Sequence, residues 1–394
     1  MPFPVLKSDS GLEVQPITKC NLELSKKEKP RIFLTTVKIP DDHIWANGLF
    51  QNVYVIYKMF ETMGYEPWLL VDNDKNNAEA NLHKKFRITD FNTYIKAPFP
   101  IVSYIEIAMS CDPSIRRFFR TMGAKASKTY LGNILNIDIE TITYYNGVNF
   151  AHHVAGELDE IFVSPHYDFH AEYAGSINGL CGKTRIAPYV WDPLFIENLE
   201  SYNSTGLTVD TPRTFIIMEP NISFQKNALI PIMTMEAYFR KFPRRIDQVI
   251  VVNGNRLKEN PYFATSVLPN LTIFKAGKLQ LLPRAHMSNI VKAFRNAIVV
   301  QHQVNNAYNY SFLEWITLGY PLVHNVSRLK DYGYYYDGNN FDAACDQIEA
   351  VVKNHTTNKE IYKAQAKQLA WLFSIYNPVN TEEWRKIAFE KISA

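Results

Sequence analysis

The chain has 394 residues, of which 46% are apolar and 21% are charged, and its formal net charge is +3. This length exceeds what one hydrophobic core usually serves, so we expect two domains. The composition is typical of a globular protein. The small positive charge argues against a dedicated nucleic-acid-binding protein, which needs a strong basic excess to neutralise phosphates.

The sequence predicts neither a metal site nor a membrane anchor. Its four cysteines are far apart and form no CxxC or Cys/His ligand pattern: Cys20, Cys111, Cys181 and Cys345. The first residues lack the apolar core of a signal peptide, and no run of about 18 apolar residues suggests a membrane-spanning helix. We therefore expect a cytoplasmic protein, or one in the host cytoplasm if the source is viral. A peripheral membrane contact is compatible with this expectation.

The first half of the chain begins with a polar extension, residues 1–29, followed by a strand over residues 31–39. A helix follows, because apolar side chains recur at the spacing of one helix face: Val53, Ile56, Tyr57 and Phe60. Gly64 suits the C-terminal end of that helix. A second strand over residues 68–71 completes a strand–helix–strand unit, which predicts a parallel sheet.

Further strands are predicted in the first half at 101–105, 128–131, 142–145 and 160–163. Three arginines follow the helix-cap pair Asp112-Pro113, and we expect them on a solvated helix face: Arg116, Arg117 and Arg120. Residues 188–212 show little periodicity and several prolines, so the junction between domains is placed there.

The second half repeats the alternation of strands and helices. Strands are predicted at 214–218, 248–252, 271–274, 297–301 and 321–324. Helices are predicted at 228–241, 285–295, 309–318, 340–353, 358–373 and 381–392. The fold class is therefore α/β, with two doubly wound, Rossmann-like domains that face each other across a cleft. Ligands bind such sheets at the carboxyl ends of their strands.

These patterns divide the chain into four parts. Residues 1–29 form the extension, 30–190 an N-terminal Rossmann-like domain, and 191–375 a C-terminal Rossmann-like domain. Residues 376–394 form a C-terminal helix that returns to the N-terminal domain.

The helix predicted at 309–318 carries a carboxylate, Glu314, within an apolar run. Its first turn follows a strand, so its free N–H groups and positive dipole end suit phosphate oxygens. Glu314 can accept two hydroxyl hydrogen bonds, as a ribose diol requires. Gly319 and Pro321 end the helix. The alternative is an exposed glutamate on a partly buried helix.

This stretch resembles the signature of family-4-like, nucleotide-sugar-dependent retaining glycosyltransferases of the GT-B fold. Glu314 stands at the second glutamate of that signature, and Leu318-Gly319-Tyr320-Pro321 continues it. The resemblance implies that Glu314 holds the nucleotide ribose. The first glutamate, which contacts the donor sugar, is replaced by Asn306. The loop that meets the sugar and diphosphate in that family corresponds to Tyr308, Asn309, Tyr310 and Ser311.

A second stretch, residues 218–231, resembles the diphosphate-binding segment of the same family. Lys226 stands at its lysine, whereas Pro220 and Asn221 occupy the place of its arginine. The resemblance implies that Lys226 contacts the diphosphate. A plain surface lysine is the alternative.

The chain also resembles a less-studied group of bacterial and viral glycosyltransferase-like proteins. The matching residues are HIWANGLFQNVYVIYKMF (43–60), YLGN (130–133), APYVWDPLF (187–195) and EPN…KN (219–227). Amides and a glycine at these positions suit an acceptor loop at the mouth of a cleft, with Asn47, Gly48, Gln51 and Asn133 as its residues. The alternative is a structural turn with a helix cap.

Together, these resemblances imply transfer of a sugar from a nucleotide-sugar to the hydroxyl of a glycan, polysaccharide or other acceptor, with retention. The resemblance also implies that residues 30–190 form the acceptor domain and residues 191–375 the donor domain, with Lys226 and Asn306 as the candidate catalytic residues. No cofactor or metal is expected, because no Asp-x-Asp motif stands in a suitable loop. Two alternatives stay open: a nucleotide-sugar epimerase of the same fold, and a non-catalytic protein that binds nucleotides or sugars.

Overall fold

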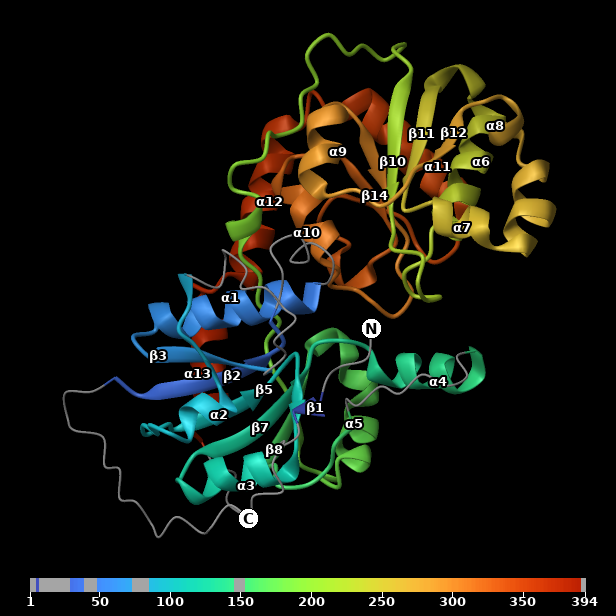
Figure 1. Cartoon of the computed structure of the whole chain (residues 1–394). Coiled ribbons are helices and arrows are strands. Elements are labelled where there is room, and N and C mark those ends of the chain that lie inside the picture. Colours follow the sequence, from blue (N-terminus) through green and yellow to red (C-terminus); the bar gives the residue numbers. More distant parts are fainter. Residues whose placement is uncertain (1–4, 7–28, 39–47, 73–84, 145–152, 391–394) are drawn as a thin grey trace. The chain divides into compact units, whose positions relative to one another are not determined.

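The computed structural model describes residues 5–6, 29–38, 48–72, 85–144 and 153–390. The chain forms two compact units. The first unit contains Met1–Asp192 together with Phe373–Ala394, and the second contains Pro193–Leu372. Each unit is built around its own parallel sheet (Figure 1).

The first unit contains a seven-stranded sheet whose neighbouring strands are all parallel. Its strands, in spatial order, are β4 (Ile88–Asp90), β3 (Glu66–Val71), β2 (Arg31–Thr36), β5 (Ser103–Glu106), β7 (Lys125–Tyr130), β8 (Glu160–Val163) and β9 (Thr184–Ile186). A separate parallel pair joins β1 (Val5–Leu6) to β6 (Ser110–Cys111). Successive strands move outward from β2 on one side and from β5 on the other, so the topology switches between these two strands.

The helices of the first unit connect and cover these strands. They are α1 (Gly48–Thr62), α2 (Phe91–Tyr94), α3 (Pro113–Thr121), α4 (Ile134–Tyr144), α5 (Ala171–Ile177) and the C-terminal α13 (Pro378–Phe389). Helix α13 packs on this unit through Trp384, whose buried ring lies 6.1 Å from the ring of Phe60. The indole Nε1 of Trp384 donates to the carbonyl oxygen of Pro188 at 3.0 Å. Pro378 occupies the first turn of α13, where its missing N–H costs nothing.

The second unit contains a six-stranded parallel sheet with the same kind of order. Its strands are β12 (Leu279–Leu281), β11 (Ile246–Val252), β10 (Arg213–Met218), β13 (Ile298–Val300), β14 (Leu322–His324) and β15 (Tyr334–Tyr335). The topology switches between β10 and β13. The predicted α/β class, with two doubly wound Rossmann-like sheets, is confirmed.

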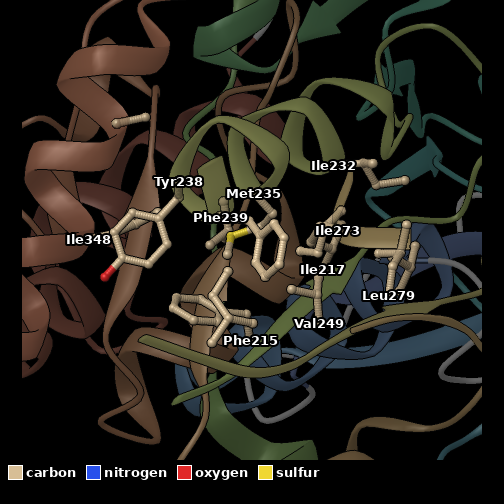
Figure 2. Close-up of a cluster of buried hydrophobic side chains, with 14 of the residues drawn as sticks. Phe215, Ile217, Ile232, Met235, Tyr238, Phe239, Val249, Ile273, Leu279 and Ile348 are labelled. Carbon is tan, nitrogen blue, oxygen red and sulfur yellow. The ribbon is translucent and has the colours of Figure 1, made fainter. Parts of the chain in front are cut away.

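The second unit has its core between the sheet and three of its helices. The helices of this unit are α6 (Leu229–Lys241), α7 (Asn255–Glu259), α8 (Thr272–Lys275), α9 (Met287–Ala293), α10 (Tyr310–Thr317), α11 (Phe341–Asn354) and α12 (Lys359–Phe373). Figure 2 shows side chains of α6, α8 and α11 meeting those of β10 and β11, among them Met235, Ile273, Ile348, Phe215 and Val249. Such interdigitated apolar packing supplies most of the stabilisation of a sheet covered by helices.

Two predicted helix ends are confirmed in detail. Gly64 follows α1 with φ of +89°, and Gly319 follows α10 with φ of +77°, a conformation that glycine adopts without a steric penalty. After α10, the N–H of Gly319 donates to the carbonyl of Ile316 and the N–H of Tyr320 to that of Trp315. This is the Schellman arrangement, which satisfies the last carbonyl groups of the helix.

The strand predicted at 142–145 is wrong, because residues 142–144 belong to helix α4. Isoleucine and threonine favour strands, and their alternation suggested one. The backbone decides otherwise: the side chain of Asn133 accepts from the N–H of Asn136 and caps the start of α4. Residue 145 lies outside the described residues.

The strand predicted at 271–274 is also wrong, because Thr272–Lys275 forms the single-turn helix α8, and the strand β12 comes later. The cause lies far away in the sequence. The buried carboxylate of Glu236, on α6, accepts the N–H groups of Thr272 and Ile273, each at 2.9 Å. A carboxylate at a helix N-terminus satisfies backbone groups that have no partner within the helix.

One of the three arginines expected on a solvated face is instead fully buried. The guanidinium of Arg116 forms a two-bond ion pair with Glu106, at 2.7 and 2.8 Å, and its side chain is 0% exposed. Arg117 and Arg120 lie nearer the surface and pair with Glu157. The strand end at Glu106 therefore determines which face of α3 turns inward.

The contacts of Glu236 generate a stability prediction. Glu236→Gln replaces one accepting oxygen with an NH₂ group that faces a backbone N–H, so α8 loses a charged cap. We expect a loss of about 1–3 kcal/mol in the free energy of unfolding, measured by urea titration. Glu360→Gln is the control, because the Glu360 side chain is 82% exposed. Equal stability of the two variants would contradict the proposed cap.

Candidate functional site

The strongest candidate site lies in the second unit, at the carboxyl ends of β10 and β13. These strands are direct neighbours, with Phe215 opposite Ile298 in the ladder. Because the topology switches between them, the connections that follow leave in opposite directions. The loop after β10 contains Lys226, and the loop after β13 contains Asn306. The sheet thus brings together two residues that are separated by 80 positions.

Asn221 organises the loop after β10. It adopts a left-handed backbone conformation, with φ of +53°, which asparagine tolerates better than most residues. Its side-chain oxygen accepts from the N–H of Ala228 at 2.8 Å, and its backbone N–H donates to the carbonyl of Lys226 at 2.9 Å. Its amide nitrogen donates to the carbonyl of Asn253 at 3.0 Å. Asn221, at a place where the family signature has arginine, therefore shapes the loop that presents Lys226.

Lys226 is partly exposed, and no carboxylate of the described residues lies within ion-pair distance of its ammonium group. Burial of the group lowers its pKa, while the nearby carboxyl group of Glu219 acts in the opposite direction. This partly exposed ammonium group has lost part of its hydration and has no paired anion among the described residues. Binding of an anionic ligand would restore the missing interaction.

Glu219 directly follows β10, and its side chain is 1% exposed. Its Oε1 accepts from the amide nitrogen of Gln303 at 3.0 Å, whereas its Oε2 has no hydrogen-bond partner among the described residues. Burial raises the pKa of Glu219 to about 8, and Lys226 and Gln303 offset only part of that effect. The carboxyl group therefore retains its proton at neutral pH.

Gln303 and Asn306 continue this network along the loop after β13. The amide nitrogen of Asn306 donates to the side-chain oxygen of Gln303 at 2.9 Å, and both side chains are buried. Asn325, just after β14, fixes the backbone of Gln303 from the other side. It accepts from the N–H of Gln303 at 2.7 Å and donates to its carbonyl at 3.0 Å.

Helix α10 begins at the same edge of the sheet. Its N-terminal residue Tyr310 is buried, and Asn309 caps the helix by accepting from the N–H of Ser311 at 3.2 Å. The hydroxyl of Ser311 accepts from the amide nitrogen of Gln301 at 2.7 Å, which ties the helix to the end of β13. The first turn is thus less open than expected, because the cap uses the N–H of Ser311. The positive end of the helix dipole still lies there.

Glu314 lies one turn further along α10. Its side chain is 6% exposed, and its carboxyl group has neither a hydrogen bond nor an ion pair with any described residue. Burial raises the pKa of Glu314 from 4.5 to about 7. A buried polar group without a partner costs about 1–3 kcal/mol. The alternative of an exposed surface glutamate is therefore wrong, and the carboxyl group is available to a ligand.

The candidate residues of the first unit lie along a different sheet. Gly48 begins α1, and Gln51 is buried in its first turn. Asn133 caps α4 after β7. Since β5 lies between β2 and β7, the two groups are not adjacent along the sheet edge. Asn47 lies outside the described residues.

Sequence reasoning missed several polar residues of the site: Glu219, Gln303, His302 and Asn325. All of them stand within three positions of an apolar strand, and this placement is the signal that would have revealed them. His302 is a structural member of the group. Its Nδ1 lies 3.0 Å from the hydroxyl of Tyr336, and burial lowers its pKa to about 4, so the ring is neutral.

Two further features concern the described residues as a set. Within them, no three or more His, Cys, Asp or Glu side chains gather in a way that could hold a metal ion. None of the helices in these parts of the chain is long and apolar enough to cross a membrane.

Comparisons with known proteins agree with the geometry. A family model described as "Protein of unknown function (DUF2827)" matches residues 32–387. No curated protein matches the sequence. The chain is similar in structure to an alpha-glucosyltransferase solved with UDP and a 13-mer DNA containing an HMU base, with a TM-score of 0.60 at 12% identity. That alignment covers 91% of this chain and 99% of the other.

Two synthases show the same likeness. Sucrose-phosphate synthase from Thermosynechococcus elongatus aligns with a TM-score of 0.54 at 11% identity, covering 91% of this chain and 98% of the other. A trehalose-6-phosphate synthase aligns with a TM-score of 0.56 at 10% identity, again covering 91% and 98%. Identities this low establish the fold alone. The expected GT-B fold is confirmed.

The raised pKa of Glu314 predicts how stability depends on pH. Between pH 4.5 and about 7 the unfolded chain releases the proton of this carboxyl group while the folded chain retains it. The wild type therefore loses stability across this window, and Glu314→Gln, which cannot ionise, avoids that loss. The variant should gain about 3 kcal/mol relative to the wild type from pH 4.5 to pH 8. Urea unfolding at several pH values measures the difference, and parallel profiles would contradict the buried carboxyl group.

Proposed function

Since the chain belongs to this family, DUF2827, and has the GT-B fold, we propose that it transfers a sugar from a nucleotide-sugar donor to a hydroxyl group of an acceptor. One observation carries the proposal. The topological switch point of the second unit holds a lysine and, on the helix beside it, a buried carboxyl group, and neither is paired with any residue that the structure describes. A nucleoside diphosphate supplies both missing partners, a diphosphate for Lys226 and a ribose for Glu314.

The roles follow from where charge develops during transfer. When the bond between sugar and diphosphate breaks, negative charge accumulates on the departing diphosphate. Lys226 and the positive end of helix α10 stabilise that charge without a metal ion. Asn306, held by Gln303, contacts the transferred sugar. Tyr308, Asn309, Tyr310 and Ser311 line the approach of the donor at the start of α10.

The acceptor is the hydroxyl of a glycan, a polysaccharide or another compound. In the first unit, the start of α1 with Gly48 and Gln51, and the cap of α4 at Asn133, provide amide groups that suit sugar hydroxyls. Retention of configuration rests on the resemblance of residues 306–325 to the signature of retaining enzymes. A cytoplasmic location and a role in glycan biosynthesis complete the proposal.

A donor screen tests this function. The purified chain is incubated with the uridine, adenosine and guanosine diphosphate esters of several sugars, with and without simple glycan acceptors. Release of the nucleoside diphosphate with a new glycoside supports transfer, and proton NMR of the anomeric position reports retention. Interconversion of one donor into another would indicate an epimerase. Binding without turnover would indicate a binding protein.

Metal independence is tested in the same assay. Because Lys226 and the N-terminal end of α10 supply the positive charge, we expect turnover to persist in excess EDTA. A loss of turnover that magnesium or manganese restores would reject this part of the proposal. The transfer reaction itself would still stand.

Two substitutions should separate binding from turnover. Glu314→Gln removes a charged acceptor of the ribose hydroxyls, so the affinity for the nucleoside diphosphate should fall about tenfold to a hundredfold. Lys226→Ala acts mainly on the charge that develops as the bond breaks. It should therefore lower turnover more than it weakens donor binding.

Calorimetry with the nucleoside diphosphate and steady-state kinetics with the donor measure these effects. Lys258→Ala, on the short helix α7, is the control for loss of a positive charge outside the site. Unchanged affinity in Glu314→Gln, or turnover within about twofold of the wild type in Lys226→Ala, would contradict the corresponding role.

A further inference from the structure

We infer that Glu219 is a positioning residue, which acts through Gln303 to fix the direction in which the Asn306 amide faces the transferred sugar. The inference rests on the proposed function and adds a residue to it. The geometry that carries it is a chain of two hydrogen bonds among three buried side chains. Glu219 is 1% exposed, Asn306 is 5% exposed and Gln303 is 7% exposed.

The two hydrogen bonds in series have a direction, and the carboxyl group of Glu219 sets it. Amide side chains can present either oxygen or nitrogen to a neighbour, whereas the Oε1 of Glu219 accepts. Gln303 therefore turns its NH₂ group toward Glu219, at 3.0 Å, and its oxygen toward Asn306. Asn306 must then turn its NH₂ group toward Gln303, at 2.9 Å. As a result, the side-chain oxygen of Asn306 points away from Gln303.

The direction survives a change in protonation. Oε1 of Glu219 already accepts from Gln303, while Oε2 has no hydrogen-bond partner among the described residues. The observed contact fits a carboxylate and equally a carboxyl group with its proton on Oε2, because Oε1 accepts from Gln303 in both forms. The charged group that faces this carboxyl group is Lys226, which cannot accept a hydrogen bond in its ammonium form.

The contact between Glu219 and Gln303 is not needed to hold the loop. The backbone of Gln303 is already fixed on both sides by Asn325, through its N–H and its carbonyl. The bond from Glu219 therefore acts on the side chain of Gln303 alone. A residue that served only to hold the loop would have no need to leave its second oxygen buried without a partner, because such a group lowers stability.

Replacement of the carboxyl group by an amide removes the direction and keeps the shape. In Glu219→Gln, residue 219 can present either an oxygen or an NH₂ group to Gln303. Both orientations of the Gln303 and Asn306 amides then become accessible. The sugar then faces the side-chain oxygen of Asn306 in some molecules and its NH₂ group in others. The partners of the diphosphate and the ribose, Lys226 and Glu314, are unchanged.

The experiment measures the affinity for a nucleoside diphosphate and for its sugar ester, by calorimetry on the full chain. The probes are UDP with UDP-glucose, ADP with ADP-glucose and GDP with GDP-mannose, and the pair that the wild type binds is used. The ratio of the two dissociation constants isolates the contribution of the sugar. We expect Glu219→Gln to leave the nucleoside diphosphate constant within about twofold and to reduce the contribution of the sugar by about tenfold.

A swapped pair distinguishes positioning from direct contact. In the double variant Glu219→Gln with Gln303→Glu, the carboxyl group now stands in the middle of the chain. It accepts from the amide at position 219 and from the NH₂ group of Asn306, so the Asn306 amide regains its original orientation. The double variant should recover the contribution of the sugar to within about threefold of the wild type.

Glu236→Gln is the matched control, because Glu236 is an equally buried glutamate of the same unit whose two oxygens both have partners. Glu236→Gln should lose stability but keep the wild-type ratio of the dissociation constants for the nucleoside diphosphate and its sugar ester. Glu219→Gln should keep its stability but show a changed ratio. Thermal unfolding of each variant gives the stability readout.

Three results would overturn the inference. If the ratio is unchanged in Glu219→Gln while the wild type binds the sugar ester, positioning is rejected and the proposed function survives. If the folded double variant fails to recover the ratio, the loss belongs to a direct contact of Glu219 with the ligand. If the wild type binds none of the probes, the proposed function and the inference fall together.

Discussion

The adjacency of β10 and β13 is the constraint on which the candidate site depends. These strands are parallel neighbours at the point where the order of the sheet reverses, so the connections that follow them diverge and leave a polar edge between them. Every strand core around this edge is apolar, but the first residues beyond the strands are Glu219 and Gln301. Asparagine residues in left-handed conformations then turn both loops. The site is thus a consequence of strand order, and its chemistry is a consequence of which residues stand one position past each strand.

Four buried glutamates of this protein show that the same residue type can be fully paired within the fold or left with an oxygen that no described residue satisfies. Glu106 is fully paired with Arg116 through two short hydrogen bonds, and Glu236 satisfies two backbone N–H groups of α8. Among the described residues, Glu219 lacks such a partner on one oxygen and Glu314 lacks one on both. Burial without compensation raises their pKa values to about 8 and about 7. Burial of these groups without hydrogen-bond partners makes folding less favourable. A ligand that supplies the missing hydrogen bonds would recover that free energy on binding.

The hydrogen bonds around Gln303 fix the orientation of the polar groups that lie beside Glu219. Asn325 fixes the backbone of Gln303, and Glu219 fixes its side chain. Both the loop and the amide group therefore have a defined orientation. A backbone and side chain held in this way have a defined orientation, as the proposed contact between Asn306 and a sugar would require.

The sequence by itself determined the alternation of strands and helices, the class of the fold and the ends of α1 and α10. These features depend on local patterns: the spacing of apolar residues, and glycines that tolerate positive φ at positions 64 and 319. It failed at residues 271–274, because a carboxylate 36 positions earlier on α6 caps a helix there and overrides the local preference for a strand. It also misplaced Arg116, since the burial of that arginine depends on Glu106 at the end of another strand.

For the site, the sequence and its family resemblance singled out Lys226, Asn306 and Glu314 as separate residues. Only the tertiary structure decided that Gln303 links Asn306 to Glu219, because this link requires β10 and β13 to be neighbours in the sheet although 79 residues lie between the end of β10 and the start of β13. It alone decided that Glu314 is buried and has no partner among the described residues. Burial and hydrogen bonding are sums over contacts from distant parts of the chain, and no local pattern of residues records them.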